Sequence, residues 1–297
     1  MLLGEHAVLH GHPALVASIA HRVTARASTF EPGKARILSA LGERVVSLDA
    51  IDASEPLEFV CAAIESVADH LTEGLELSIE ADMPPDIGFG TSAAVTVACR
   101  AAVHALLGQP ISPDELHRDC LDLVRGIQGR ASGADVAASV YGGVLLYRTD
   151  PVSIESLKAA PPLVVAYSGH KEKTADVIAM VDARHHEQAD LVNALFDVAG
   201  NLSIQASDVT REGEWSLLGQ CLNAGQEVME SLGVSNDHLE SMIEELRNAP
   251  GVRGAKISGA GLGDCIVGIG NAEGATLSYE LLPASVDSQG VRIEQDV

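Results

Sequence analysis

The sequence has 297 residues, of which 46% are hydrophobic and only 3% aromatic, and its formal net charge is −23. This length and apolar content suffice for one large or two ordinary globular domains. A strongly acidic chain repels polyanions, so neither nucleic acid nor an anionic membrane surface is expected as its partner. Five widely spaced cysteines, no apolar run of membrane-spanning length and no signal-peptide pattern at the start predict a cytoplasmic protein.

The first half of the chain alternates between strand and helix patterns. Residues 1–29 alternate apolar and polar residues around a GHP turn, which predicts strands joined by a turn. Residues 56–73 have helical apolar spacing and residues 75–82 alternate with period two, which predicts a helix followed by a strand.

Two further helices are expected before the middle of the chain. The first is a long, mostly buried helix that ends at Gly108, and the second begins at Ser112, where the sequence SPDE is a capping box. From Asp135 to Arg148 the pattern becomes strand-like.

A polar, proline-containing stretch at residues 149–162 is the expected domain boundary, which divides the chain into residues 1–155 and 156–297. The second part is predicted to contain a core strand, two helices, a capped amphipathic helix, and a strand, glycine loop and strand. Their ranges are 161–169, 171–208, 211–232, 235–251 and 254–270.

The stretch IGFGTSAA, residues 87–94, is a candidate phosphate-binding loop. Its glycines let the backbone approach a ligand, its hydroxyls can reach a metal or phosphate, and the following helix offers free N–H groups and a positive dipole end. The stretch lacks the lysine of a Walker loop and the spacing of a dinucleotide fingerprint. A glycine turn with a Thr or Ser N-cap is the alternative interpretation.

Two other stretches are candidates for chemistry. KISGAGLGDC, residues 256–265, is a glycine-dense loop between predicted strands, and a β-turn or bulge is the alternative for it. GRASGADVAAS, residues 129–139, places Asp135 after a flexible Ser-Gly pair, where an N-cap or turn aspartate is the alternative.

Four motifs occur in the order and spacing of one enzyme family: GEHAVLHGHPAL, PPDIGFGTSAA, SGADVAASVYGG and KISGAGLGDC. The chain resembles the GHMP small-molecule kinases, and GEHAV followed by GxPAL is most similar to the mevalonate kinases among them. YSGHKEKT and the stretch from Asn223 and Gln226 through LGVS extend the resemblance over nearly the whole chain. It implies an α+β fold of two lobes, ribosomal-protein-S5-like and then ferredoxin-like, with the active site in the cleft between them.

The resemblance also implies roles for individual residues. Asp135 matches the catalytic aspartate, which accepts the proton of the substrate hydroxyl or orients it for attack on the γ-phosphoryl group. The other implied positions are the phosphate loop Gly88, Gly90, Thr91, Ser92 and Ala93, with Ser92 as Mg²⁺ ligand; the substrate residues Glu5, His6, Lys173 and Thr174; and the second glycine loop Gly259, Gly261 and Gly263.

The implied reaction is ATP-dependent phosphorylation of the primary hydroxyl of mevalonate, in isoprenoid precursor synthesis, with ATP and Mg²⁺ as cofactors. A homodimer and feedback inhibition by isoprenoid phosphates are further expectations from the resemblance. The alternatives are a phosphomevalonate kinase, another GHMP metabolite kinase, or a GHMP-fold paralogue that binds a metabolite without transferring phosphate. Basic residues in the acceptor pocket would favour phosphomevalonate, and Arg125, Arg130 and Lys171 are the candidates.

The sequence departs from the family pattern at several positions. The strand lysine of mevalonate kinases would fall just upstream of Met1, so either the chain begins late or the lysine is absent. Val124 stands where the family often has a glutamate, and the sequence QGRASG, with Gln128 and Ala131, is closer to phosphomevalonate kinases. Asp264 replaces a small residue, and an acid there would repel phosphate unless it points away or helps to hold the metal.

Overall fold

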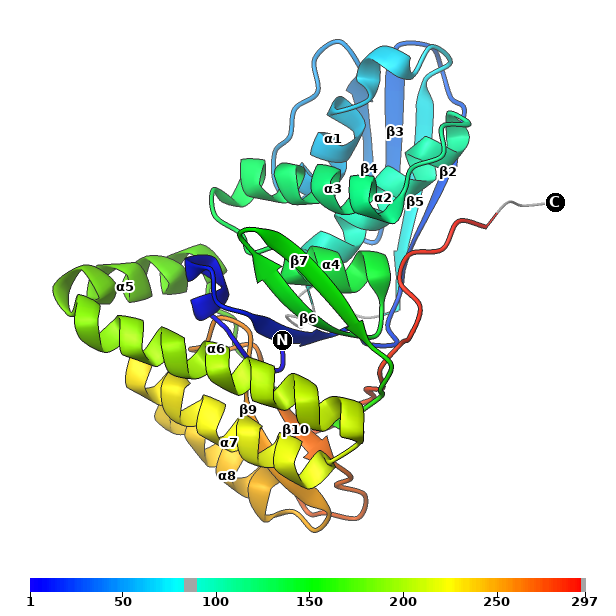
Figure 1. The fold of residues 1–297 in the computed structure, drawn as a ribbon. Helices are drawn as coiled ribbons and strands as arrows, with labels where there is room; N and C mark the ends of the chain where they lie inside the picture. The colour runs from blue at the N-terminus through cyan, green and yellow to red at the C-terminus, as the bar shows by residue number, and fades with distance from the viewer. Residues whose placement is uncertain (83–89, 295–297) are drawn as a thin grey trace. The chain divides into compact units, whose positions relative to one another are not determined.

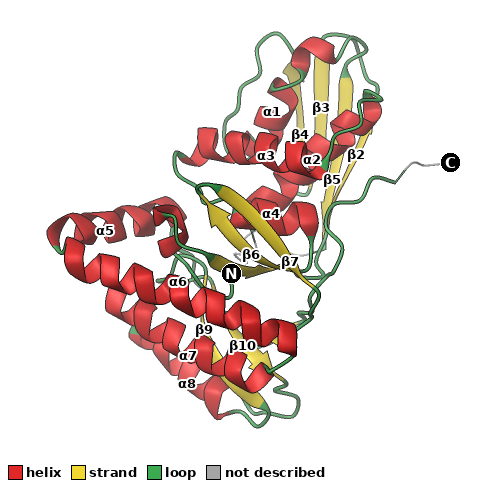
Figure 2. Cartoon of the chain, in the orientation of Figure 1, coloured by secondary structure: helices red, strands yellow, loops and turns green. Residues whose placement is uncertain are grey.

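Residues 1–82 and 90–294 are described by the computed structural model of the chain. They form two compact units, which Figure 1 and Figure 2 show with the chain coloured by position and by secondary structure. The first unit contains Met1–Ala20 and Gly142–Ser288, and the second contains the described residues of 21–82, 90–141 and 289–294. These units group the start of the chain with its second half. The predicted domain division at residue 155 stays a prediction.

The second unit is a four-stranded sheet covered by helices (Figure 1). The strand order is β2-β5-β3-β4, in which β3 and β5 are parallel and the other neighbours antiparallel. Its elements are β2 (Val23–Ser28), β3 (Lys34–Ser39), β4 (Gly42–Ser47), α1 (Glu58–Glu65), the 3₁₀ helix η2 (Ala68–His70), β5 (Leu75–Ala81), α2 (Thr91–Leu106), α3 (Pro113–Gln128) and α4 (Ala134–Tyr141).

Two buried cores hold the second unit together. Ile64 of α1 and Cys99 of α2 share one core with Leu77 of β5, which joins these helices to the sheet. Val124 of α3 and Val136 of α4 belong to another core with α2. Complete burial of such side chains stabilises the fold by about 1.5–3 kcal/mol each. Val124, at the position where the resemblance leads one to expect a glutamate, therefore packs in this core.

The start of α3 confirms the predicted capping box. The Ser112 hydroxyl accepts a hydrogen bond from the Glu115 N–H at 3.3 Å, and the Glu115 carboxylate accepts one from the Ser112 N–H at 3.0 Å. Two backbone donors at the helix end are thus satisfied reciprocally. The predicted strand at residues 75–82 and the helix ending near Gly108 are confirmed as β5 and α2.

The first unit contains two antiparallel sheets and a layer of helices, in which α6 packs beside α7 while α7 and α8 both cover β9 and β10 (Figure 1). The strand orders are β1-β6-β7 and β11-β8-β10-β9. Its elements are η1 (Ala7–His10), β1 (Ala14–Ala17), β6 (Val144–Thr149), β7 (Val152–Leu157), β8 (Leu163–Tyr167), α5 (Thr174–Glu187), α6 (Ala189–Glu212), α7 (Trp215–Leu232), α8 (Asp237–Asn248), β9 (Val252–Ser258), β10 (Cys265–Gly270) and β11 (Leu281–Leu282).

Side chains cover the outer edge of β9, the last strand of its sheet. The Asn223 amide oxygen accepts from the Ala255 N–H at 3.0 Å, and the Gln226 amide oxygen accepts from the Ile257 N–H at 3.0 Å. Arg247 donates to the Ala255 carbonyl at 2.8 Å. An uncovered edge would leave these backbone groups available to another chain, so α7 and α8 supply the partners that a further strand would otherwise provide.

The backbones of α7 and β9 touch at glycines. A Cβ atom on Gly219 would lie 2.4 Å from the Arg253 carbonyl oxygen, and one on Gly254 would lie 2.0 Å from the Gly219 oxygen. No side chain fits at either position. The close approach brings the amide side chains of α7 within reach of the strand edge.

The prediction of strands from the beginning of the chain is only partly right. Leu3 makes a bridge to Leu15, and β1 and β2 are present, but residues 7–10 form the 3₁₀ helix η1. Gly4 has a φ of +92° and His6 a φ of +59°, both outside the extended region. These conformations turn the GEH segment away from a strand path.

Two other sequence predictions are wrong in part. Of the stretch 135–148, predicted as strand-like, residues 135–141 lie in α4, because their small apolar side chains pack into a helical core before Gly142 and Gly143 end the helix with positive φ. The single helix predicted at residues 171–208 is two helices, α5 and α6, separated at Gln188. The break has no glycine or proline to mark it in the sequence. The strands β3, β4, β7 and β11 had no predicted counterpart.

All five cysteines are buried and none forms a disulfide. This agrees with the reduced thiols that the cysteine spacing predicts. In residues 1–82 and 90–294, no helix has the length and apolar composition needed to cross a membrane.

Candidate active site

In the second unit, α2 begins at a glycine in the left-handed conformation. Gly90 is the N-cap residue with a φ of +72°, and having no side chain it cannot itself cap the first turn, which contains Thr91, Ser92 and the buried Ala93. The N–H groups of a first turn and the positive end of the helix dipole form a site for an anion. Four of the predicted phosphate-loop residues therefore stand at one helix end, and the fifth, Gly88, lies outside the described residues.

Asp135 lies beside this helix end. A Cβ atom on Gly90 would be 3.4 Å from the Asp135 Cβ atom. Asp135 is exposed near the start of α4 and its Oδ1 accepts a hydrogen bond from the Val136 N–H at 2.9 Å. An accessible carboxylate thus adjoins a helix end suited to phosphate.

The loop before Asp135 is held by α3. Arg125 Nε donates to the Ala131 carbonyl at 3.1 Å, and His117 hydrogen-bonds the Gly133 backbone. Ser132 Oγ accepts from the Ala134 N–H at 3.3 Å, at the beginning of α4. Arg125, considered above as a phosphate-binding residue, therefore supports the aspartate loop.

Oxygen donors suited to Mg²⁺ are available at this helix end. Ser92 contributes a hydroxyl in the first turn of α2, and Asp135 contributes a carboxylate against Gly90. Magnesium prefers such hard oxygen ligands and is usually bound by few protein groups together with phosphate oxygens. Among the described residues no three His, Cys, Asp or Glu side chains form a metal cluster. The residues present fit a metal carried by a nucleotide.

In the first unit, the GEH segment is fastened to the second glycine loop. His6 Nε2 lies 2.7 Å from the Ala260 carbonyl oxygen, and the Glu5 carboxylate lies 2.6 Å from the Lys256 ammonium. His6 is 5% exposed, and desolvation lowers its pKa below 6.5 despite the opposing hydrogen bond to Ala260. The imidazole is therefore neutral at neutral pH, and Nε2 carries the hydrogen that the carbonyl accepts.

Two glycines of the second loop are required by close backbone packing. A Cβ atom on Gly261, whose φ is +101°, would lie 2.4 Å from the Val234 oxygen. One on Gly263 would lie 2.8 Å from the His170 oxygen. Gly259, with a φ of +105°, also has a conformation that side chains disfavour. The backbone path of the loop therefore depends on its close contacts with Val234 and His170.

Asp264 turns its carboxylate back into this loop. It is 6% exposed, has a φ of +62°, and its Oδ2 would be 3.2 Å from a Cβ atom on Gly259. Its Oδ1 is buried without a hydrogen-bond partner among the described residues. Desolvation raises the pKa of Asp264 above 3.8, and the positive charge of Lys171 opposes the shift.

Lys173 and Thr174 stand at the beginning of α5. Lys173 is the N-cap residue, its carbonyl accepts from the Asp176 N–H at 2.9 Å, and both side chains are exposed. The helix start thus presents a cation and a hydroxyl to solvent.

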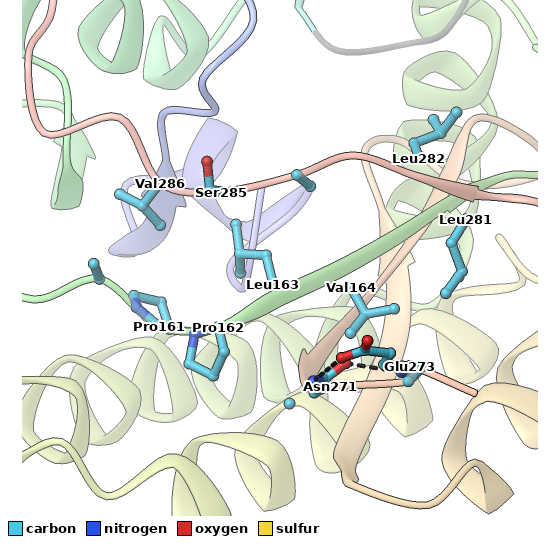
Figure 3. A pocket seen from close by; sticks show the side chains of 14 residues that line it. Pro161, Pro162, Leu163, Val164, Asn271, Glu273, Leu281, Leu282, Ser285 and Val286 are labelled. Atoms are coloured by element: carbon cyan, nitrogen blue, oxygen red, sulfur yellow. Dashed lines mark hydrogen bonds between the residues drawn. The ribbon is translucent and has the colours of Figure 1, made fainter. Parts of the chain in front are cut away.

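Two hollows lie on the first unit. One, of about 510 Å³, is bordered by Pro162, Val164 and Leu281, and Asn271 and Glu273 are joined by a hydrogen bond at its rim (Figure 3). None of the candidate site residues that the structure describes lines it. The other, of about 520 Å³, includes Gly263 and so borders the second glycine loop.

Two protein-family models match the chain, one in its first half and one in its second half. Residues 58–143 match the GHMP kinases N terminal domain, and residues 206–279 match the GHMP kinases C terminal domain. The chain belongs to the GHMP kinase family. The first match includes Gly90 and Asp135, and the second includes Lys256 and the second glycine loop.

Individual GHMP kinases resemble the chain over nearly its whole length. The mevalonate kinase of Aeropyrum pernix is 30% identical over 99% of this chain and 96% of its own. The crystal structure of L. major mevalonate kinase in complex with R-mevalonate has a TM-score of 0.80, at 24% identity, over 98% of this chain and 94% of that one. Streptococcus pneumoniae phosphomevalonate kinase, in complex with phosphomevalonate and AMPPNP, has a TM-score of 0.75 at 16% identity, over 90% and 88%. The GHMP kinase fold predicted from the sequence is confirmed.

Two kinds of residue near the candidate site are not indicated by the sequence motifs. The sequence motif gives Lys256 no role, although it follows Gly254 and Ala255 and precedes Ile257, and a charge among such residues is a signal for a buried ion pair. His117 and Arg125 support the aspartate loop from a neighbouring helix, and no local pattern indicates that contact.

Proposed function

We propose that this GHMP kinase transfers the γ-phosphoryl group of ATP to the primary hydroxyl of mevalonate. The O–P bond to ADP breaks, a bond to the mevalonate oxygen forms, and the hydroxyl proton is released. The observation that carries the proposal is the contact of Gly90, at the phosphate-binding end of α2, with Asp135. The full-length similarity to archaeal mevalonate kinases supports mevalonate as the acceptor.

The start of α2 would bind the phosphates of the nucleotide. Gly90 lets the backbone approach the anion, and the N–H groups of Thr91, Ser92 and Ala93 would face it with no cap from a Gly90 side chain. Gly88 belongs to the same sequence motif. Backbone donors supply positive potential without basic side chains, which suits a chain with a net charge of −23.

Asp135 would orient the acceptor hydroxyl and take its proton. Phosphoryl transfer depends mostly on alignment and on neutralisation of charge, so the position of this carboxylate matters as much as its basicity. Its accessibility supports direct contact with the acceptor. The Ser92 hydroxyl would hold Mg²⁺, which supplies charge neutralisation at the phosphate oxygens.

We assign acceptor binding to His6, Lys173 and Thr174, with Glu5 in the same segment as His6. Neutral His6 can hydrogen-bond a hydroxyl, and the Lys173 ammonium can pair with the carboxylate of mevalonate. Gly259, Gly261 and Gly263 would steady the site. Homodimer formation and a cytoplasmic location stay predictions.

A coupled ADP-release assay with Mg²⁺-ATP tests the proposal, with mevalonate and phosphomevalonate as separate acceptors. Turnover with mevalonate alone is expected. A preference for phosphomevalonate would show that the proposed acceptor is wrong and that the proposed kinase activity is right. If neither acceptor is used and mevalonate binds without ATP consumption, the chain is a non-catalytic binder and the proposed function is wrong.

A further inference from the structure

The ammonium group of Lys256 is enclosed inside the first unit. Lys256 is 0% exposed and Glu5 4% exposed, and their charged atoms are 2.6 Å apart. The ammonium also donates to the Ile257 carbonyl. A buried charge without a partner is strongly unfavourable, so the fold keeps Lys256 only together with the Glu5 carboxylate.

The stem of Lys256 has a defined place between β9 and α7. A Cβ atom on Gly225 would lie 3.3 Å from Lys256 Cε and 2.4 Å from the Leu3 side chain. The glycine therefore leaves room for both. Gln226, the next residue of α7, accepts a hydrogen bond from the Ile257 N–H at 3.0 Å. This bond fixes the backbone of β9 directly after Lys256. The backbone and the aliphatic stem of Lys256 are therefore held in place by α7, and its ammonium group extends to the GEH segment.

The GEH segment has a backbone shape that needs support. Gly4 has a φ of +92° and His6 a φ of +59°, and His6 is not a glycine. Non-glycine residues in the left-handed region persist where the surroundings hold them. Two contacts do so here: the Glu5–Lys256 ion pair and the hydrogen bond from His6 to the Ala260 carbonyl.

These contacts assign different tasks to neighbouring residues. The Glu5 carboxylate is engaged by an internal cation, so it is not a free ligand for the acceptor. His6 uses Nε2 on Ala260, which leaves Nδ1 as the nitrogen with a lone pair. The orientation of that nitrogen depends on the turn that Glu5 anchors.

We propose that Lys256 is a positioning residue for acceptor binding, which acts through Glu5 by fastening the GEH segment to β9 so that His6 Nδ1 is correctly aimed. The inference rests on the proposed function for the identity of the acceptor. Lys256 itself does not touch substrate. It sets the shape of the segment that does.

Three variants separate positioning from simple stability. Lys256→Met leaves Glu5 buried without its partner and is expected to fold poorly. The double variant Glu5→Met with Lys256→Met replaces the buried pair by apolar side chains of similar volume, and such replacements are often neutral or stabilising. Glu5→Asp keeps both charges but shortens the reach by one methylene group.

The double variant and Glu5→Asp are expected to raise the KM for mevalonate at least tenfold while the KM for ATP changes less than twofold. Amide hydrogen exchange should become faster in residues 4–11, where the Val8 N–H donates to the Gly4 carbonyl at 3.0 Å. A folded double variant with the wild-type KM for mevalonate and wild-type protection would overturn the inference, because the pair would then be only structural.

A surface ion pair of the same unit is the matched control. Arg211 and Glu155 are 2.7 Å apart but 36% and 57% exposed. Glu155→Gln should leave both KM values and the exchange rates unchanged. If the wild-type chain turns over no acceptor, the proposed function fails, and the exchange measurement still decides whether Lys256 positions the segment.

Discussion

Gly90 and Asp135 lie against one another in the second unit, with 3.4 Å between the Asp135 Cβ atom and the place where a Gly90 Cβ atom would be. They are 45 positions apart in the sequence. One belongs to the helix end suited to phosphate, and the other is the carboxylate proposed to act on the acceptor hydroxyl. A side chain at Gly90 would therefore disturb both groups.

Gly90→Ala should impair nucleotide binding beyond its effect on stability. Alanine at a φ of +72° costs about 1 kcal/mol, and its methyl group adds bulk where phosphate would approach. Gly108→Ala is the matched control, because Gly108 has a φ of +64° with nothing within 4 Å of the added atom. Both should lower the unfolding midpoint similarly, but only Gly90→Ala should weaken binding of a fluorescent ATP analogue, by roughly tenfold or more.

Asp135→Asn should reduce kcat by about 10²- to 10⁴-fold, the range for loss of a positioned proton acceptor. The fold should be unchanged, because the side chain is exposed and similar in shape. Asp122→Asn, an exposed acid on α3, is the control and should keep full activity. Steady-state kinetics with circular dichroism checks both. An Asn variant with wild-type kcat would remove Asp135 from the mechanism.

Asp264→Asn should stabilise the protein at neutral pH. The raised pKa of Asp264, caused mainly by desolvation, means that ionisation is harder in the folded than in the unfolded state. Stability is therefore lost as pH rises from about 3.8 through the folded pKa. Asparagine also tolerates the left-handed conformation.

Urea unfolding at pH 7 and near pH 4 measures this effect. The gain from Asp264→Asn should be largest at pH 7 and should shrink towards pH 4. A loss of stability at pH 7 would mean instead that the Asp264 carboxylate is held by an attractive interaction.

Gly219→Ala should destabilise the first unit by about 1–3 kcal/mol or more, because overpacking forces backbone shifts. The added atom would be 2.4 Å from the Arg253 oxygen. Gly126→Ala, within α3 and with nothing within 4 Å, should stabilise by about 0.5–1 kcal/mol. Denaturant midpoints compare the two variants. Equal effects would show that α7 and β9 are not in backbone contact.

The cysteines should be unreactive in the folded protein. All five are buried, and desolvation raises the pKa of Cys120 and of Cys265 to about 12. The reactive thiolate is therefore scarce at pH 8. A thiol reagent should label none in buffer and five in denaturant. Rapid labelling in buffer would show that at least one cysteine becomes exposed in solution.

Local sequence determined much of the architecture. The capping box at Ser112, the alternation of β5 and the apolar spacing of α2 each depend on residues a few positions apart, so those elements were predictable. The family motifs also predicted the GHMP kinase fold. The sequence did not reveal that residues 134–141 are helical, because small apolar residues suit a buried strand and a buried helix equally.

Tertiary structure decided the tasks of the charged residues. Sequence motifs placed Glu5 with the substrate residues and left Lys256 without a role, but folding brings them together across 251 positions. Likewise Arg125 is directed to the Ala131 carbonyl, and Val124 is buried in a core. Periodicity reports which side of an element is apolar, whereas the partner of a buried charge depends on how distant elements pack. That pairing is enforced by the cost of removing a charge from water.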